Sequence, residues 1–171
     1  MITLDKCRGL LEQQEGIEAV EVARNEFVRA RFANRVDPNS PHNLVVHPIE
    51  EKQALKIVVP EIAKVKSGSE LFRVLSHLNY DVLVGKVGVD SRDGEVRVEV
   101  VHPCRDGAEE DPSPEVFARL VEVAIGLTHD MVMLATHVGM VEAGVPEDVA
   151  RKFIEQFRGE GKESGADEET L

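Results

Sequence analysis

The sequence has little of what several classes of binding site require. It contains no tryptophan, one tyrosine and only 4% aromatic residues, so we do not expect a surface that stacks nucleic-acid bases or sugar rings. Positive charge is in the minority, because 20 Lys and Arg stand against 32 Asp and Glu and the formal net charge is −12. An acidic body repels phosphate groups, which argues against binding to nucleic acid or to an anionic membrane surface.

Cysteines and long apolar segments are also scarce. The two cysteines, Cys7 and Cys104, form no pair with metal-binding spacing. Segments without a charge are short, and the apolar one from Met131 to Val141 has 11 residues, too few to span a bilayer. The first residues lack the pattern of a signal peptide. We therefore expect a cytoplasmic protein with reduced thiols, and nothing in the sequence indicates a cofactor or a metal.

Apolar residues make up 42% of the chain, and their spacing predicts alternating helices and strands. Helices are expected at 4–11, 70–78, 115–140 and 146–158. Strands are expected within 17–33 and at 44–46, 54–59, 81–89 and 95–101. Pro60 is expected to end the third of these strand segments, because proline cannot donate to a β-ladder. Thr3 and Ser113 are expected to cap the first and third helices, and Pro114 fits the first helical position.

These elements predict an α+β fold with an antiparallel sheet of about five strands flanked by helices. The expected order is α-βββ-α-ββ-α, followed by a C-terminal helix. We predict one domain over residues 1–158. Residues 159–171 contain five acids, one lysine and a single large apolar residue, so they are expected to form a disordered acidic tail.

The residues with chemical potential do not form a recognisable catalytic or metal-binding pattern. His129 and His137 lie eight positions apart on the long helix, whereas a helical metal pair has i, i+4 spacing. Cys104 follows His102 closely, but an ordinary buried thiol is the favoured interpretation. We predict no catalytic residue and no metal ligand.

Arg24, Arg29, Arg31 and Arg35 form the only concentration of basic residues. The favoured interpretation is the charged solvent face of two strands. The alternative is a docking patch for an acidic segment of a partner, or for the acidic tail of this chain.

The long helix is apolar on more than one stripe, which predicts burial on two sides. One side is expected to cover the sheet, and the other to meet the last helix or a second subunit. The residues predicted to mediate dimerisation or partner binding by packing are Phe117, Leu120, Ile125, Leu127, Met131 and Met133.

The middle of the chain resembles the YbjN family, described as proposed bacterial sensory transduction regulators, and its order of elements resembles the type III secretion chaperone-like fold. The residues that carry the resemblance are Leu78-Asn79, Gly85-Lys86, Asp93-Gly94-Glu95-Val96 and the helix from Pro114. It covers roughly residues 69–134. The sequence departs at Val101-His102-Pro103, where family members usually have Leu-Pro.

The resemblance implies a small, acidic homodimer that binds other polypeptides, as a chaperone, adaptor or regulator, and is not an enzyme. A competing hypothesis is a small-ligand protein or enzyme with a pocket between the sheet and the long helix, lined by His102, Cys104 and His129. A third is a subunit that acts only inside a larger complex.

Overall fold

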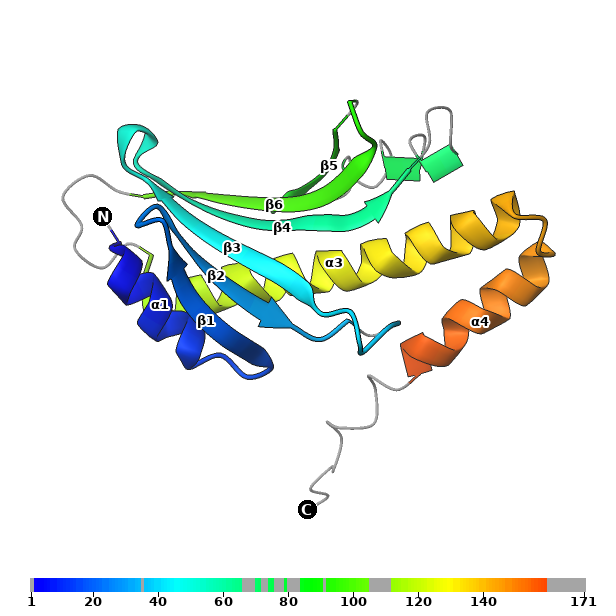
Figure 1. The fold of residues 1–171 in the computed structure, drawn as a ribbon, viewed down its shortest axis with the longest axis horizontal. Coiled ribbons are helices and arrows are strands. Elements are labelled where there is room, and N and C mark those ends of the chain that lie inside the picture. The colour runs from blue at the N-terminus through cyan, green and yellow to red at the C-terminus, as the bar shows by residue number, and fades with distance from the viewer. Residues whose placement is uncertain are drawn as a thin grey trace, which may run out of the picture.

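The computed structural model describes residues 2–34, 36–65, 70–71, 74–75, 79, 84–90, 92–104 and 112–159. The helical elements are α1 (Leu4–Glu12), the 3₁₀ turn η1 (Glu50–Lys52), α3 (Pro114–Glu142) and α4 (Glu147–Gly159) (Figure 1). The strands are β1 (Ile17–Ala23), β2 (Phe27–Phe32), β3 (His42–Ile49), β4 (Ala54–Lys64), β5 (Lys86–Val89) and β6 (Glu95–Pro103).

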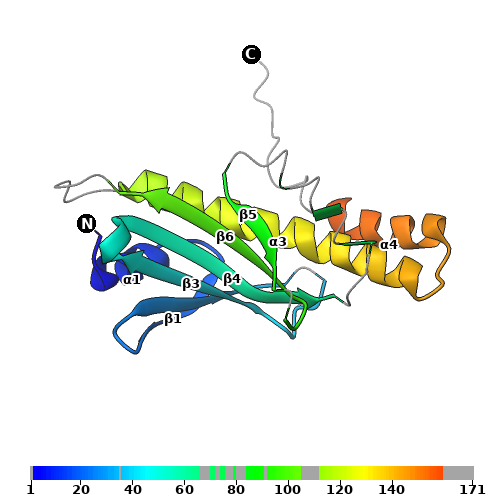
Figure 2. The same ribbon diagram turned by 90° about the horizontal axis from the view of Figure 1, so that it is seen from above.

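The described strands form one antiparallel sheet in the order β1-β2-β3-β4-β6-β5. The helices α1 and α3 pack on one face of this sheet, and α4 lies beside the C-terminal half of α3 (Figures 1 and 2). Alternate strand residues such as Val28, Ile57 and Val98 are fully buried between sheet and helices, as period-2 patterning requires. The opposite face of the sheet is not covered by any described element.

Both predicted N-caps are confirmed. The Thr3 side chain accepts a hydrogen bond from the Lys6 amide, and the Ser113 side chain accepts one from the Val116 amide. A serine or threonine in this position satisfies an amide that has no partner inside the helix. The strand number differs slightly from the expected five, because residues 17–33 form two strands. Arg24 and Asn25 turn the chain between them with φ of 54° and 55°.

The prediction that Pro60 ends its strand is wrong, since β4 continues to Lys64. Strand β3 pairs with β4 only as far as Val58, so Pro60 interrupts no ladder on that side. On the other side the register with β6 shifts between Val59 and Ala63, where Glu61 has a φ of 53°. A bulge of this kind accommodates proline within a strand.

Other predictions fall partly or wholly outside the described residues. Of the helix expected over 70–78, residues 70, 71, 74 and 75 are described and helical, as is residue 79. Strand β5 is described from Lys86, whereas residues 81–83 of the expected strand, Arg35 and residues 160–171 of the expected tail lie outside.

Candidate interaction surfaces

The six residues predicted to mediate association lie mostly inside the chain's own core. Phe117 and Met131 have no exposed surface, and Leu120 and Met133 are 8% and 7% exposed. Ile125 and Leu127 are partly buried and pack against the same core. Met133 lines a hollow between α3 and α4 together with Ile154, so the last helix provides part of the second cover that the apolar pattern required.

The apolar surface that α3 leaves accessible follows a seven-residue repeat. Val116 and Val123 are seven positions apart, as are Leu127, Leu134 and Val141 in turn, and such a repeat places all five on one side of a helix. We call these five residues the α3 seam. Val116 and Val141 are each 40% exposed, and the other three are partly buried against the core. This repeat is the sequence signal that could have identified the seam in place of the buried residues.

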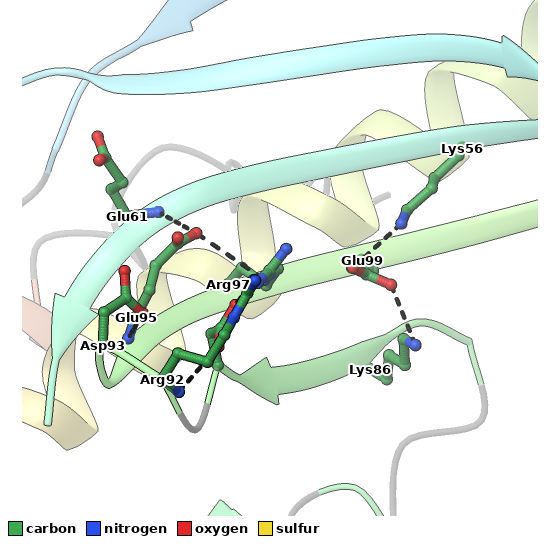
Figure 3. A network of polar contacts seen from close by, with 9 residues as sticks. Lys56, Glu61, Lys86, Arg92, Asp93, Glu95, Arg97 and Glu99 are labelled. Carbon is green, nitrogen blue, oxygen red and sulfur yellow. Dashed lines mark hydrogen bonds and ion pairs between the residues drawn. The ribbon is translucent and has the colours of Figure 1, made fainter.

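Two strands of the open sheet face share the carboxylate of Glu99. It lies 3.1 Å from Lys56 Nζ and 3.0 Å from Lys86 Nζ, and these lysines come from the neighbouring strands β4 and β5 (Figure 3). Burial raises the pKa of the Glu99 carboxyl, but the hydrogen bonds from Lys86 and Lys56 outweigh it and hold that pKa below its ordinary value. Glu99 therefore ties three strands together on this face.

A second group of ion pairs lies at the β5–β6 turn. The Asp90 carboxylate pairs with Arg92 at 2.6 Å and with Arg97 at 3.1 Å. Hydrogen bonds from Arg92 are the main cause that holds the pKa of Asp90 far below its ordinary range. The region drawn in Figure 3 also contains Lys56, Lys86, Glu61, Asp93, Glu95 and Glu99. Together with Asp90, Arg92 and Arg97 these side chains make five acidic and four basic groups. This part of the open face is therefore close to neutral, although the chain carries −12.

The predicted arginine patch is divided between a turn and a strand. Arg24 lies in the β1–β2 turn, whereas Arg29 and Arg31 are exposed on the outer face of β2. Arg29 lies 3.6 Å from Glu21 and 5.9 Å from the centre of the Phe27 ring. The strand interpretation thus describes these two arginines correctly, and docking of an acidic segment stays a prediction.

Two of the histidines pack against the same aromatic ring. His42 and His129 both pack against the ring of Phe32, with ring centres 5.4 and 5.8 Å away. His129 Nε2 also lies 3.3 Å from the Ala33 carbonyl oxygen. Burial, with a smaller contribution from His129, lowers the pKa of His42. Among the described residues no group of three or more His, Cys, Asp and Glu side chains could hold a metal ion.

Both cysteines are buried, and neither forms a disulfide. Burial is the largest cause that raises the pKa of Cys7 to about 12, so this sulfur stays a thiol near neutral pH and is a poor nucleophile. The Cys104 sulfur lies 3.9 Å from the His102 carbonyl oxygen, so it faces the backbone of that histidine.

A hollow of about 450 Å³ does lie between the sheet and the long helix. Its described walls are Ile62 to Lys64 at the end of β4, the following Val65, Leu71, and the last turns of α3 from Val132 to Glu142. None of the three polar residues expected in such a pocket, His102, Cys104 and His129, lines it. Among the described residues that line it, the polar ones are instead Lys64, Thr136 and Glu142.

None of the described helices combines the length and hydropathy that a membrane crossing requires. By sequence, the chain matches no known protein family and no curated protein. The fold therefore defines the structural class of this protein. It is an α+β fold in which a long helix covers one face of an antiparallel sheet.

Among solved structures, the chain is similar to YbjN from E. coli, a candidate transcription regulator. The TM-score is 0.56 at 17% identity, over 81% of this chain and 94% of YbjN. The predicted resemblance is confirmed at the level of the fold. The ExoU–SpcU complex of the Pseudomonas aeruginosa type III secretion system also matches, with a TM-score of 0.37 at 18% identity over 73% of this chain and 93% of that one.

Proposed function

We propose that this protein is a non-enzymatic, cytoplasmic protein-binding adaptor, chaperone or regulator that acts as a homodimer. The observation that carries the proposal is the α3 seam, an apolar repeat that stays accessible at both ends of the long helix after α1, the sheet and α4 have packed. Apolar residues at coiled-coil spacing are a common means of joining two helices.

The surroundings of the seam support a packing role. Gly85 leaves room for Leu127 beside the sheet, since a Cβ at Gly85 would lie 2.9 Å from Leu127 Cδ1. Leu134 borders the hollow between α3 and α4. A partner that covers Val116 and Val141 would therefore extend a core that already reaches the intervening seam residues.

The proposal that the protein is not an enzyme is supported by what its reactive side chains do. His42 and His129 pack on Phe32, and the Cys7 thiol is buried with a raised pKa. Each of these groups has a structural environment, whereas a catalytic site holds a nucleophile and a base within hydrogen-bond reach of each other.

The test replaces Val116 and Val141 together by glutamate and measures the molar mass by light scattering during size-exclusion chromatography. Both side chains are 40% exposed, so the single chain should still fold. We expect the wild type to elute as a dimer and the double variant as a monomer, because burying two uncompensated carboxylates opposes association.

The matched control replaces Val101 and Val149 by glutamate, which makes the same chemical change at side chains 51% and 48% exposed. This control should remain dimeric. A seam variant that stays dimeric while it folds normally would contradict the proposed interface. Affinity capture with both variants then tests partner binding, since a partner that uses the seam is lost only from the first.

The hollow of about 450 Å³ beside α3 favours a small-ligand protein as the second candidate function. Its volume lies within the range of roughly 300–1,000 Å³ that is typical of ligand pockets. A thermal-shift screen with metabolites tests this candidate, and Thr136→Leu should abolish any shift that comes from this pocket.

A further inference from the structure

The outer face of β2 carries a hollow with the chemistry of a carboxylate site. The hollow has a volume of about 230 Å³ and is lined by Ala19, Glu21, Arg29, Arg31 and Asn43. It forms where the β1–β2 register shifts between Glu18 and Glu21 and where Ala19 adopts a φ of 50°. The bulge displaces β1 at this point and leaves space above the two arginines.

The two arginines differ in how their charge is balanced. Arg29 has a neighbouring carboxylate, since Glu21 lies 3.6 Å away, which is longer than a charge-assisted hydrogen bond. Glu18 faces Arg31 across the ladder, yet among the described residues no ion pair or hydrogen bond engages the Arg31 guanidinium. Asn43, its neighbour on β3, adds an amide donor to the same hollow.

The dimensions select a ligand with paired carboxylates. Arg29 and Arg31 are two positions apart on one strand, so they face the same side about 6.8 Å apart. Two acidic residues with the same two-residue spacing in an extended segment match that separation. The hollow itself is smaller than the pockets of roughly 300–1,000 Å³ that enclose drug-sized ligands.

We propose that the hollow over β2 binds the acidic C-terminal segment of this same protein, with Asp167 and Glu169 engaging Arg29 and Arg31. These acids have the required two-residue spacing, and residues 160–171 contain five acidic side chains against one lysine. A segment joined to the same chain, or held by a dimer, is present at high effective concentration, so a modest affinity suffices. This proposal goes beyond the proposed function and does not depend on the α3 seam.

The test compares amide chemical shifts of residues 160–171 in ¹⁵N-labelled full-length protein. Arg29→Gln with Arg31→Gln should move the signals of residues 167–169, because both guanidinium partners are lost. Arg8→Gln with Arg119→Gln is the control, since it removes the same charge from two exposed helical arginines and should leave those signals in place. Added salt should move the wild-type signals toward the positions of the first variant.

A reciprocal pair of variants tests the spacing. Asp167→Asn with Glu169→Gln should shift the Arg31 side-chain Nε–H signal, whereas Glu160→Gln with Glu163→Gln should not. Signals of residues 167–169 that stay unchanged in the arginine variant, or that move equally in the control, would overturn the proposal. An acidic peptide from another protein would then be the better candidate for this hollow.

Mixing labelled Asp167→Asn, Glu169→Gln chains with unlabelled wild type tells which chain supplies the segment. Recovery of the wild-type Arg31 signal shows binding between two chains, and no recovery shows binding within one chain. Both results support the proposal.

Discussion

Gly94 shows what a single residue contributes to the β5–β6 turn. It has a φ of +75°, and a Cβ built there would lie 2.0 Å from the Val65 carbonyl oxygen. The Val65 amide in turn donates to the Gly94 carbonyl oxygen at 2.9 Å. The turn therefore passes directly against the end of β4, and only glycine permits both the conformation and the approach.

Gly94→Ala is expected to destabilise the protein by about 2–4 kcal/mol, through left-handed strain and through overlap with Val65. Urea unfolding monitored by circular dichroism measures the change. Gly126→Ala is the matched control, because a Cβ there meets nothing within 4 Å and alanine favours the helix by about 0.5–1 kcal/mol. Equal stability of the two variants would show that the close approach at Gly94 is incorrect.

The environment of His42 predicts a pH dependence. Its pKa lies below the ordinary 6.5 mainly because of burial, so the unfolded chain binds the proton more readily than the folded one. Above pH 6.5 His42 is neutral in both states and does not reduce the free energy of unfolding. As the pH falls from there toward the pKa of His42 in the folded protein, protonation of the unfolded chain lowers that free energy. Urea midpoints of wild type and His42→Leu over this range should show a smaller pH dependence for the variant. Parallel losses would contradict this explanation.

At the scale of elements, Asn79 completes the outer edge of β5. Its side-chain amide donates to the Val87 carbonyl oxygen at 2.7 Å and accepts from the Val87 amide at 2.7 Å. The side chain thereby replaces one residue of a neighbouring strand. An edge strand with unpaired backbone groups is a site for unwanted pairing, and this contact protects β5 from it.

Asn79→Ala should leave the Val87 backbone without these partners and cost about 1–3 kcal/mol. Hydrogen exchange followed by NMR should show faster exchange of the Val87 amide. Asn39→Ala, in the exposed loop before β3, should leave that rate unchanged. Unaltered exchange at Val87 in Asn79→Ala would mean that another group protects the edge.

The parts of the fold that depend on neighbouring residues in sequence could be predicted, and those that depend on strand pairing could not. Ser113 and Pro114 locate the start of α3 because capping is local. The prediction from Pro60 was wrong because a proline can lie within β4 only where β3 no longer pairs with that strand, and the sequence does not show where that pairing stops. The strand pattern likewise placed Arg29 and Arg31 on one face, but the hollow above them depends on the bulge in β1.

The residues predicted to mediate association were mostly buried ones for the same reason, because burial depends on which parts of the chain pack together. The apolar stripes predicted that α3 is buried on two sides, but they did not tell which side the chain itself covers. Phe117 and Met131 are fully buried, so replacing either by a charged residue would unfold the chain without testing association. The seven-residue repeat of the α3 seam is visible in the sequence, whereas only the folded chain shows that Val116 and Val141 are its accessible members.

At the scale of the whole molecule, net charge and apolar surface act in opposite directions. A charge of −12 favours solubility and opposes self-association. The α3 seam and the nearly neutral ion-pair region of the open sheet face are the surfaces where that opposition is weakest. We therefore expect the homodimer to form through the seam.

The most direct test is the molar mass of the unmodified protein by sedimentation equilibrium at near-physiological salt. A dimer has twice the chain mass of 18.9 kDa, and we predict that mass at micromolar concentration, with dissociation in Val116→Glu, Val141→Glu. A wild type that sediments as a single chain across the accessible concentrations would contradict the proposed homodimer.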